Sequence, residues 1–459
     1  MAFSFLAALL EKWIGCRILQ DIAGFYSFLQ FYRYELIIVN GSEVIWILMR
    51  ILKIIKMLPM KILTVHNSYL QRGGEDAVAD MESRLLRDHG HDVECYRQSN
   101  VGIHEMPAMA LACASIWSHR SAAAIDQSCA AFQPDLIHAH NTFPLISPAL
   151  YWLAARRKIP IVLTLHNFRL LCPQAMFLRE GKNCEACLGK LPWRAVTRKC
   201  YRNSLSQSGA VAVVLTAHRA IGTYRNKVTS YIAPSEFSRG KFVAGGFPPE
   251  RIHVKPNFVD VAETPEWTGR KGGLFVGRLS PEKGLGVLIE AMEGMRGDAA
   301  ADCPYRRIRV VGSGPMEGQA KKQFGDRYLG AKSAAEVLDL LRTSLFLVVP
   351  STCGESFGLV VIEAFSCGVA VIASNHGALG ELVEDGVTGL LAIPGDAADL
   401  ARKIQWACDH PDKMLSMGRA ARAEYLKRYC ASENYKLLMD IYVNAMSAET
   451  SSTREAKNV

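Results

Sequence analysis

Two carboxylates eight residues apart, Glu355 and Glu363, mark the part of the sequence in which chemistry is easiest to place. An apolar run ending at Ser351 predicts a buried parallel strand, and a helix is predicted from about Gly358 to Phe365. Glu355 would then lie in the connecting loop and Glu363 about two helical turns further on, since a helix rises about 1.5 Å per residue. A loop carboxylate suits sugar hydroxyls, and a carboxylate along the helix suits the adjacent hydroxyls of a ribose.

The start of this predicted helix is suited to bind an anion. The amides of Phe357, Gly358 and Leu359 would point out of the helix where a phosphate is stabilised, and Gly358 lets the backbone come close. The alternative is that Glu355 and Glu363 are surface acids of an amphipathic helix. The apolar neighbours of Glu363, in VVIEAF, disfavour it, because an unpaired buried carboxylate is costly.

Two cations form a second group. Residues 272–286, GGLFVGRLSPEKGLG, are typical of a short strand, a loop at Gly277 and a helix beginning near Glu282. Arg278 supplies a planar fork for phosphate oxygens and Lys283 a point charge. Two converging cations would stabilise a departing diphosphate, whereas the alternative is a solvated cationic loop. A further turn, VVGSGP, contains Gly312 and Gly314 after a predicted strand, but glycines are common in such turns for backbone reasons alone.

In this order and spacing, GRLSPEKG, VVGSGP and GESFGLVVIEAFSCG resemble the second half of the family 4 (group 1) retaining glycosyltransferases of GT-B fold. The first half agrees. MKILTVHNSYLQRGGEDAVADM resembles the first strand of that family and its double-glycine loop, with Gly73 and Gly74, and PDLIHAHN, IVLTLHNFRLLCP and YIAPSEFSRGKF resemble later segments. The resemblance covers roughly residues 60 to 446.

The resemblance implies transfer of a sugar, with retention, from a nucleotide diphosphate sugar to an acceptor hydroxyl. The donor phosphate would accept the proton of the acceptor on the same face of the sugar. The implied catalytic residues are His166, Arg278, Lys283 and Glu355. The implied donor-binding residues are Gly73, Gly74, Gly277, Gly312, Gly314, Phe357, Gly358, Leu359 and Glu363. His138 and His140 end a predicted strand, and of the two His140 is the better candidate for lining the acceptor side; His66 is also a candidate near the acceptor. The sequence lacks the aspartate-rich signature of a catalytic metal.

Length and patterning predict an α/β fold with two doubly wound Rossmann-like domains, and the resemblance implies that these domains face a cleft. A chain of 459 residues exceeds one hydrophobic core, and strand and helix patterns alternate in both halves. We expect an N-terminal extension, an acceptor domain, a linker, a nucleotide-sugar domain and a disordered tail. Their respective bounds are 1–59, 60–255, 256–273, 274–446 and 447–459. The resemblance implies that the last helix crosses back to the first domain.

The formal net charge of +9 favours anionic partners. No nucleic-acid-binding motif accompanies the charge, so nucleic acid is not expected. An anionic membrane surface is favoured, because the resemblance implies sugar or lipid-linked acceptors and basic patches are attracted to anionic lipid. The alternative is a basic soluble protein whose charge has no partner.

Residues 1–59 contain two apolar runs, AFSFLAALL and VIWILMRILKIIKMLPM. Arg50, Lys53 and Lys56 interrupt the second, so no uninterrupted apolar run reaches the length of a spanning helix. A signal peptide is not indicated either, because a basic start and a small-residue cleavage site are missing. Two interpretations remain: an interfacial anchor at the cytoplasmic face of a membrane, or a mis-assigned start with synthesis beginning at Met57 or Met60.

Thirteen cysteines without a signal peptide indicate a reducing, cytoplasmic compartment. Four of them, Cys172, Cys184, Cys187 and Cys200, have a spacing that could close a structural zinc site or hold an iron–sulfur cluster. The alternative is four unligated thiols.

Two other functions stay open from the residues. A nucleotide-sugar epimerase of the same fold would use similar phosphate contacts without an acceptor, and a non-enzymatic nucleotide-binding scaffold would not require both glutamates.

Overall fold

The computed structural model describes residues 59–70, 72–261, 263–295 and 308–455. The predicted extension therefore lies outside the described residues except for Pro59, and neither interpretation of it is tested. Residues 59–445 form one compact unit that contains both sheets. Within the described ranges, no helix has both the length and the apolar character needed to cross a membrane.

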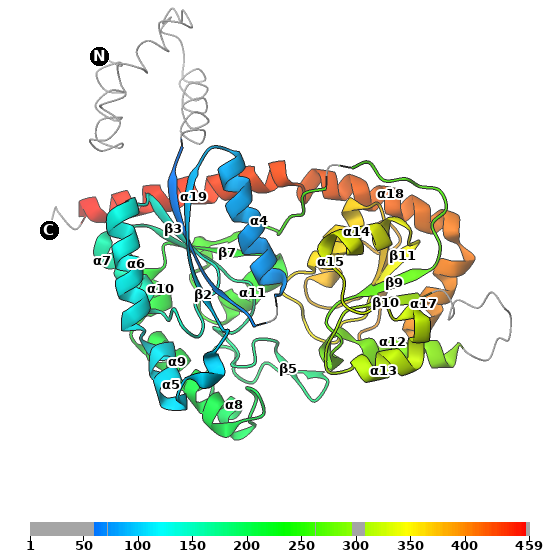
Figure 1. Cartoon of the computed structure of the whole chain (residues 1–459), viewed down its shortest axis with the longest axis horizontal. Coiled ribbons are helices and arrows are strands. Elements are labelled where there is room, and N and C mark those ends of the chain that lie inside the picture. Colours follow the sequence, from blue (N-terminus) through cyan, green and yellow to red (C-terminus); the bar gives the residue numbers. More distant parts are fainter. Residues whose placement is uncertain (1–58, 71, 262, 296–307, 456–459) are drawn as a thin grey trace, which may run out of the picture. The chain divides into compact units, whose positions relative to one another are not determined.

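The first half contains a sheet of six parallel strands in the order β2-β1-β3-β4-β7-β8. Figure 1 labels β2, β3 and β7 of this sheet. The strands are β1 (Lys61–Ser68), β2 (Asp92–Ser99), β3 (Leu136–Ala139), β4 (Ile161–Thr164), β7 (Ser230–Ala233) and β8 (Ile252–Val254). The helices are α4 (Gly74–Asp88), α5 (Ala108–Ile116), α6 (His119–Phe132), α7 (Ala149–Arg157), α8 (Trp193–Thr197), α9 (Leu205–Ala220), α10 (Thr223–Lys227) and α11 (Glu236–Ala244). A small antiparallel pair joins β5 (Leu178–Arg179) to β6 (Lys182–Asn183).

The second half contains a sheet of five parallel strands in the order β10-β9-β11-β12-β13. The strands are β9 (Gly273–Val276), β10 (Ile308–Val311), β11 (Phe346–Val349), β12 (Ala370–Ser374) and β13 (Gly389–Ala392). The helices are the 3₁₀ helices η4 (Pro281–Lys283) and η6 (Gly325–Arg327), together with α12 (Leu285–Gly294), α13 (Glu317–Phe324), α14 (Ala334–Arg342), α15 (Leu359–Ser366), α16 (Leu379–Leu382), α17 (Ala397–Asp409), α18 (Pro411–Arg428) and α19 (Ala431–Glu455). The strand order reverses between β9 and β11, because β10 lies on one side of β9 and the later strands lie on the other. The order reverses in the same way between β1 and β3 in the first sheet. Doubly wound folds bind ligands at such switch points.

Strand β11 is an uninterrupted apolar run because both of its faces are covered. In β11, Phe346 and Val348 belong to one core cluster with residues of α12 and α17. Leu347 and Val349 belong to another cluster with residues of α14, α15 and α18. This is the packing expected of a parallel sheet between two layers of helices, and it agrees with the predicted fold class.

The last helix returns to the first half, as the resemblance implied. Asn434, Tyr435 and Tyr442 of α19 bond to side chains of the first half, over 3.0, 2.8 and 2.7 Å. The helix continues to Glu455, so residues 447–455 are helical where a disordered tail was predicted. Between β8 and β9, the described residues contain no helix or strand, and the irregular stretch falls where the linker was predicted.

Candidate active site

The loops after β9 and β11 meet through Lys283 and Glu355. Lys283 ends η4, and its Nζ lies 2.8 Å from Oε2 of Glu355 in the loop before α15. The lysine side chain is 34% exposed and the glutamate side chain 15%. Two residues that were selected from separate segments of the sequence thus form one ion pair at the switch point of the second sheet.

The surroundings keep the Lys283 side chain charged. Burial alone would lower the pKa of the Lys283 ammonium, but Glu355, with smaller contributions from Cys353 and Glu282, raises that pKa overall. The hydroxyl of Ser351 donates a hydrogen bond to the second carboxylate oxygen of Glu355. Lys283 is therefore a fixed, protonated cation with one face open to solvent.

Glycines allow the loops beneath this pair to pack closely. Gly284 has a φ of +76°, and a Cβ there would lie 1.8 Å from the carbonyl oxygen of Pro350. A Cβ on Gly312, with a φ of +141°, would lie 1.9 Å from the carbonyl oxygen of Gly277, and one on Gly314 would lie 2.6 Å from the carbonyl oxygen of Leu279. Loop packing is thus a sufficient reason for Gly312 and Gly314, and their contact with a donor stays a prediction.

Helix α15 presents a free amino end and an unpaired carboxylate. Within the described residues, the amides of Phe357, Gly358 and Leu359 donate no hydrogen bond, and none is donated to the side chain of Glu363. Burial raises the pKa of the Glu363 carboxyl to about 7. Glu363 is the fifth residue of α15, about one turn beyond its start, which lies one residue after the predicted start at Gly358. The residues between Glu355 and Leu359 form a loop, so Glu355 and Glu363 are not separated by two regular helical turns as predicted. Arg278 is exposed beside η4.

His166 follows β4 and lies against the loop of the second half. Its ring Nε2 is 3.0 Å from Nδ1 of His140, and burial lowers the pKa of His166 to about 3. Its carbonyl oxygen accepts a hydrogen bond from the hydroxyl of Ser356, the residue after Glu355. The hydroxyls of Ser235 and Ser238 donate to the carbonyl oxygen of Ser356 over 2.8 and 2.9 Å. The structure therefore brings a neutral His166 next to the loop that contains Glu355.

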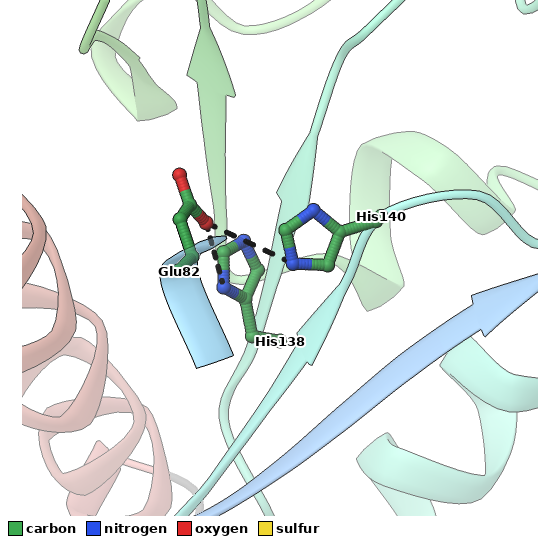
Figure 2. Close-up of side chains that lie close together, drawn as sticks. All are labelled: Glu82, His138 and His140. Atoms are coloured by element: carbon green, nitrogen blue, oxygen red, sulfur yellow. Dashed lines mark ion pairs between the residues drawn. The ribbon is translucent and has the colours of Figure 1, made fainter. Parts of the chain in front are cut away.

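Figure 2 shows Glu82 of α4 beside His138 and His140, with one carboxylate oxygen 3.7 Å from a nitrogen of each ring. This group does not fit a metal centre. The Lys255 ammonium already lies 2.6 Å from the other oxygen of Glu82, and the hydroxyl of Tyr442 lies 2.7 Å from Nδ1 of His138. Burial lowers the pKa of His138 to about 3 and that of His140 well below its usual value. The cluster is a buried ion pair lined by neutral histidines.

Comparisons with known proteins identify the family. Residues 72–263 match the family model described as Glycosyltransferase Family 4, and residues 262–424 match the one described as Glycosyl transferases group 1. The chain belongs to the group 1, family 4 glycosyltransferases.

Relatives of this glycosyltransferase family cover only part of the chain. An uncharacterized glycosyltransferase of Methanocaldococcus jannaschii is 34% identical over 163 residues, which are 34% of this chain and 43% of that protein. The phosphatidyl-myo-inositol mannosyltransferase of Mycolicibacterium smegmatis is 32% identical over 239 residues, 49% of this chain and 60% of that protein. The chain thus spans about half the length of these relatives. The crystal structure of Anabaena HepE in complex with UDP has a TM-score of 0.57 at 21% identity, over 83% of this chain and 99% of that one, which shows the GT-B fold.

The acids of α4 in this family member were not predicted from the sequence. Glu82 lies four residues after Val78 and three before Leu85, on the buried face of the helix. That spacing could have revealed Glu82, because an acid on an apolar helix face requires a partner.

Asp76 was missed in the same helix, and it organises the double-glycine loop. Its carboxylate lies 2.8 Å from Nε2 of His66 and accepts a hydrogen bond from the amide of Gly73 over 2.8 Å. Gly73 caps α4 and Gly74 is its first residue. The two glycines therefore start the helix, and their contact with a donor stays a prediction.

Proposed function

We propose that the chain is a retaining glycosyltransferase that moves a hexose from a nucleotide diphosphate sugar to an acceptor hydroxyl, in polysaccharide or glycolipid synthesis. The observation that carries this proposal is the Lys283–Glu355 pair beside the free amino end of α15. The solved complexes of HepE with UDP and with UDP-glucose support the donor class, and the mannosyltransferase relative supports a hexose.

The chemistry required of these groups is electrostatic. Departure of the nucleoside diphosphate places negative charge beside Lys283, which exchanges its contact with Glu355 for phosphate oxygens. Arg278 and the amides at the start of α15 share that charge. Glu355, released from the lysine, accepts hydrogen bonds from sugar hydroxyls, while the Glu363 carboxylate accepts those of the ribose.

A same-face displacement, which needs no protein base, is consistent with the low pKa of His166. A buried His166 with a pKa of about 3 is a poor proton acceptor near neutral pH. In the proposed step, the bond from the anomeric carbon to the phosphate oxygen breaks, and a bond from that carbon to the acceptor oxygen forms on the same face. The proton of the acceptor moves to the departing phosphate oxygen, so the step needs no base from the protein.

The test is to incubate the purified chain with UDP, GDP, ADP and dTDP sugars and sugar or lipid-linked acceptors. We expect one nucleotide at 100 times its dissociation constant to stabilise the protein by about 2.7 kcal/mol. Its sugar should appear on the acceptor with the donor's anomeric configuration, determined by NMR. An isomerised sugar formed without acceptor would indicate an epimerase instead, and binding without any turnover would indicate a scaffold.

We further propose peripheral contact with anionic membrane at the cytoplasmic face, on the basis of the net charge of +9. Sedimentation with phosphatidylglycerol vesicles, compared with phosphatidylcholine vesicles, tests it. Equal recovery with both lipids would contradict this contact and leave the transfer reaction unaffected.

A further inference from the structure

The segment from Cys172 to Asn203 has little regular structure to hold its shape. Its helix and strands are limited to β5, β6 and α8, of two, two and five residues. Non-glycine residues with positive φ are uncommon, yet six of the nine in the described chain lie here. They are Ala175, Phe177, Glu180, Lys199, Arg202 and Asn203. A segment with so many irregular positions requires some other constraint.

Four cysteines of this segment surround one cavity. Cys172, Cys184, Cys187 and Cys200 all line a space of about 20 Å³, and all four are free thiols. Cys172 and Cys187 are buried, and the other two are half-buried. A space of this size accommodates a single water-sized particle, since one water requires about 10–15 Å³. It is therefore large enough for one metal ion.

The charges around the cavity favour thiolates bound to a cation. Arg179, Arg194 and Arg198 line the same space, and Nη1 of Arg198 lies 3.9 Å from the sulfur of Cys184. Four thiolates around one divalent cation leave a net charge of about −2, which guanidinium groups offset.

We propose that Cys172, Cys184, Cys187 and Cys200 bind one Zn²⁺ as a structural site. Four sulfur ligands close the tetrahedral shell, which leaves no position for a reacting water. Among the described residues, the group of three or more potential ligand atoms that all lie within 4.8 Å of one another is Glu82, His138 and His140. The four cysteine sulfurs do not form such a group, so they are more widely spaced here than they would be around a bound ion. Zinc–sulfur bonds of about 2.3 Å would bring them to about 3.8 Å from one another.

The metal would hold together a segment that is already attached to α9 and α11. Arg219 of α9 donates hydrogen bonds to the carbonyl oxygens of Leu170 and Lys190, over 2.7 and 2.8 Å. Glu185, between two of the cysteines, forms a 2.5 Å ion pair with Lys241 of α11. Metal loss should therefore loosen this segment locally and leave the rest of the first half folded.

The test is the metal content of the full chain, expressed without a tag in zinc-supplemented medium and analysed by mass spectrometry. We expect about one zinc per chain, released together with four thiols when an organomercurial is added. Cys184→Ser combined with Cys187→Ser should abolish zinc binding. The control Cys113→Ser, at an exposed cysteine outside the cavity, should retain it.

The variant Glu82→Gln separates this site from the other group of potential ligands, and it should also retain zinc. Metal-free wild-type protein, or iron with acid-labile sulfide, would overturn the proposal. So would zinc that survives loss of both cysteines or disappears in Glu82→Gln. If the double cysteine variant does not fold, the zinc and thiol stoichiometry of the wild-type chain decides. None of these measurements requires a sugar donor, so the result is independent of the proposed transfer reaction.

Discussion

Replacing Lys283 with alanine should slow sugar transfer by about 30- to 900-fold. A unit charge about 4 Å from a phosphate oxygen is worth about 4 kcal/mol at an effective dielectric constant of about 20. Loss of one preorganised group of this kind typically costs about 2 to 4 kcal/mol in the transition state. Each 1.36 kcal/mol is about tenfold in rate, which gives the expected range.

The same substitution should change the stability of the fold very little. Lys283 is 34% exposed, and an ion pair this open to solvent contributes under about 1 kcal/mol. Glu355 keeps the hydrogen bond from Ser351 when the lysine is removed. A large loss of rate with a nearly unchanged melting temperature would therefore separate a role in the reaction from a role in folding.

The assay is the initial rate of acceptor glycosylation at saturating donor, alongside a thermal melt. Lys322→Ala is the matched control, because it removes the same charge from an exposed position on α13. Lys283→Arg should recover part of the rate, since it keeps the charge but changes its shape. Wild-type transfer by Lys283→Ala would refute the assignment, and an equal loss in Lys322→Ala would show that net charge matters and not position.

Three further substitutions test other parts of the site. Because burial raises the pKa of Glu363 to about 7, its ionised fraction and the calorimetric affinity for UDP should rise up to about tenfold from pH 6 to 8, a dependence that Glu363→Gln should reduce. The raised pKa also means that Glu363 should lower the free energy of unfolding as pH rises from 4.5 through about 7, and Glu363→Gln should flatten that slope in urea titrations. Lys255→Met should lower the free energy of unfolding in urea by about 3 to 5 kcal/mol because it leaves Glu82 buried without a cation, and adding Glu82→Gln should recover much of the loss. Gly284→Ala should lower the free energy of unfolding by at least about 1–2 kcal/mol, because Gly284 has a φ of +76°, and it should lower the melting temperature and the transfer rate as well. Gly318→Ala, at a position with open space around it, should change none of these quantities.

Local patterns predicted most of the second half. Strands such as β11 are recognisable because burial on both faces makes them uninterrupted apolar runs. Lys283 and Glu355 could be selected as charged residues in loops after such strands. Their direct contact could not be predicted, because it depends on how two loops 72 residues apart pack on each other. The start of the helix that contains Glu363 was predicted to within one residue, but its separation from Glu355 is not two regular turns, because the residues before Leu359 form a loop.

The buried polar cluster was beyond sequence reasoning for a related reason. Lys255 and Glu82 are 173 residues apart, and neither has a local partner in the sequence that would predict the pair. The packing of α4 near the end of β8 brings the Lys255 ammonium within 2.6 Å of the Glu82 carboxylate. Helical spacing could have identified Glu82 as buried, but the identity of its partner required the tertiary structure.

Because α19 is synthesised last, its contacts determine when the polar interior of the first half is completed. Lys255 bonds to Asn434, which is added to the chain 179 residues later. At about 5–20 residues per second, the first half leaves the ribosome roughly 10 to 35 s before this partner exists. During that interval the Lys255–Glu82 pair lacks its amide and His138 lacks the hydroxyl of Tyr442. A nascent chain stalled before α19 should therefore expose this polar interior to chaperones and proteases, even though every strand of the first sheet has already been made.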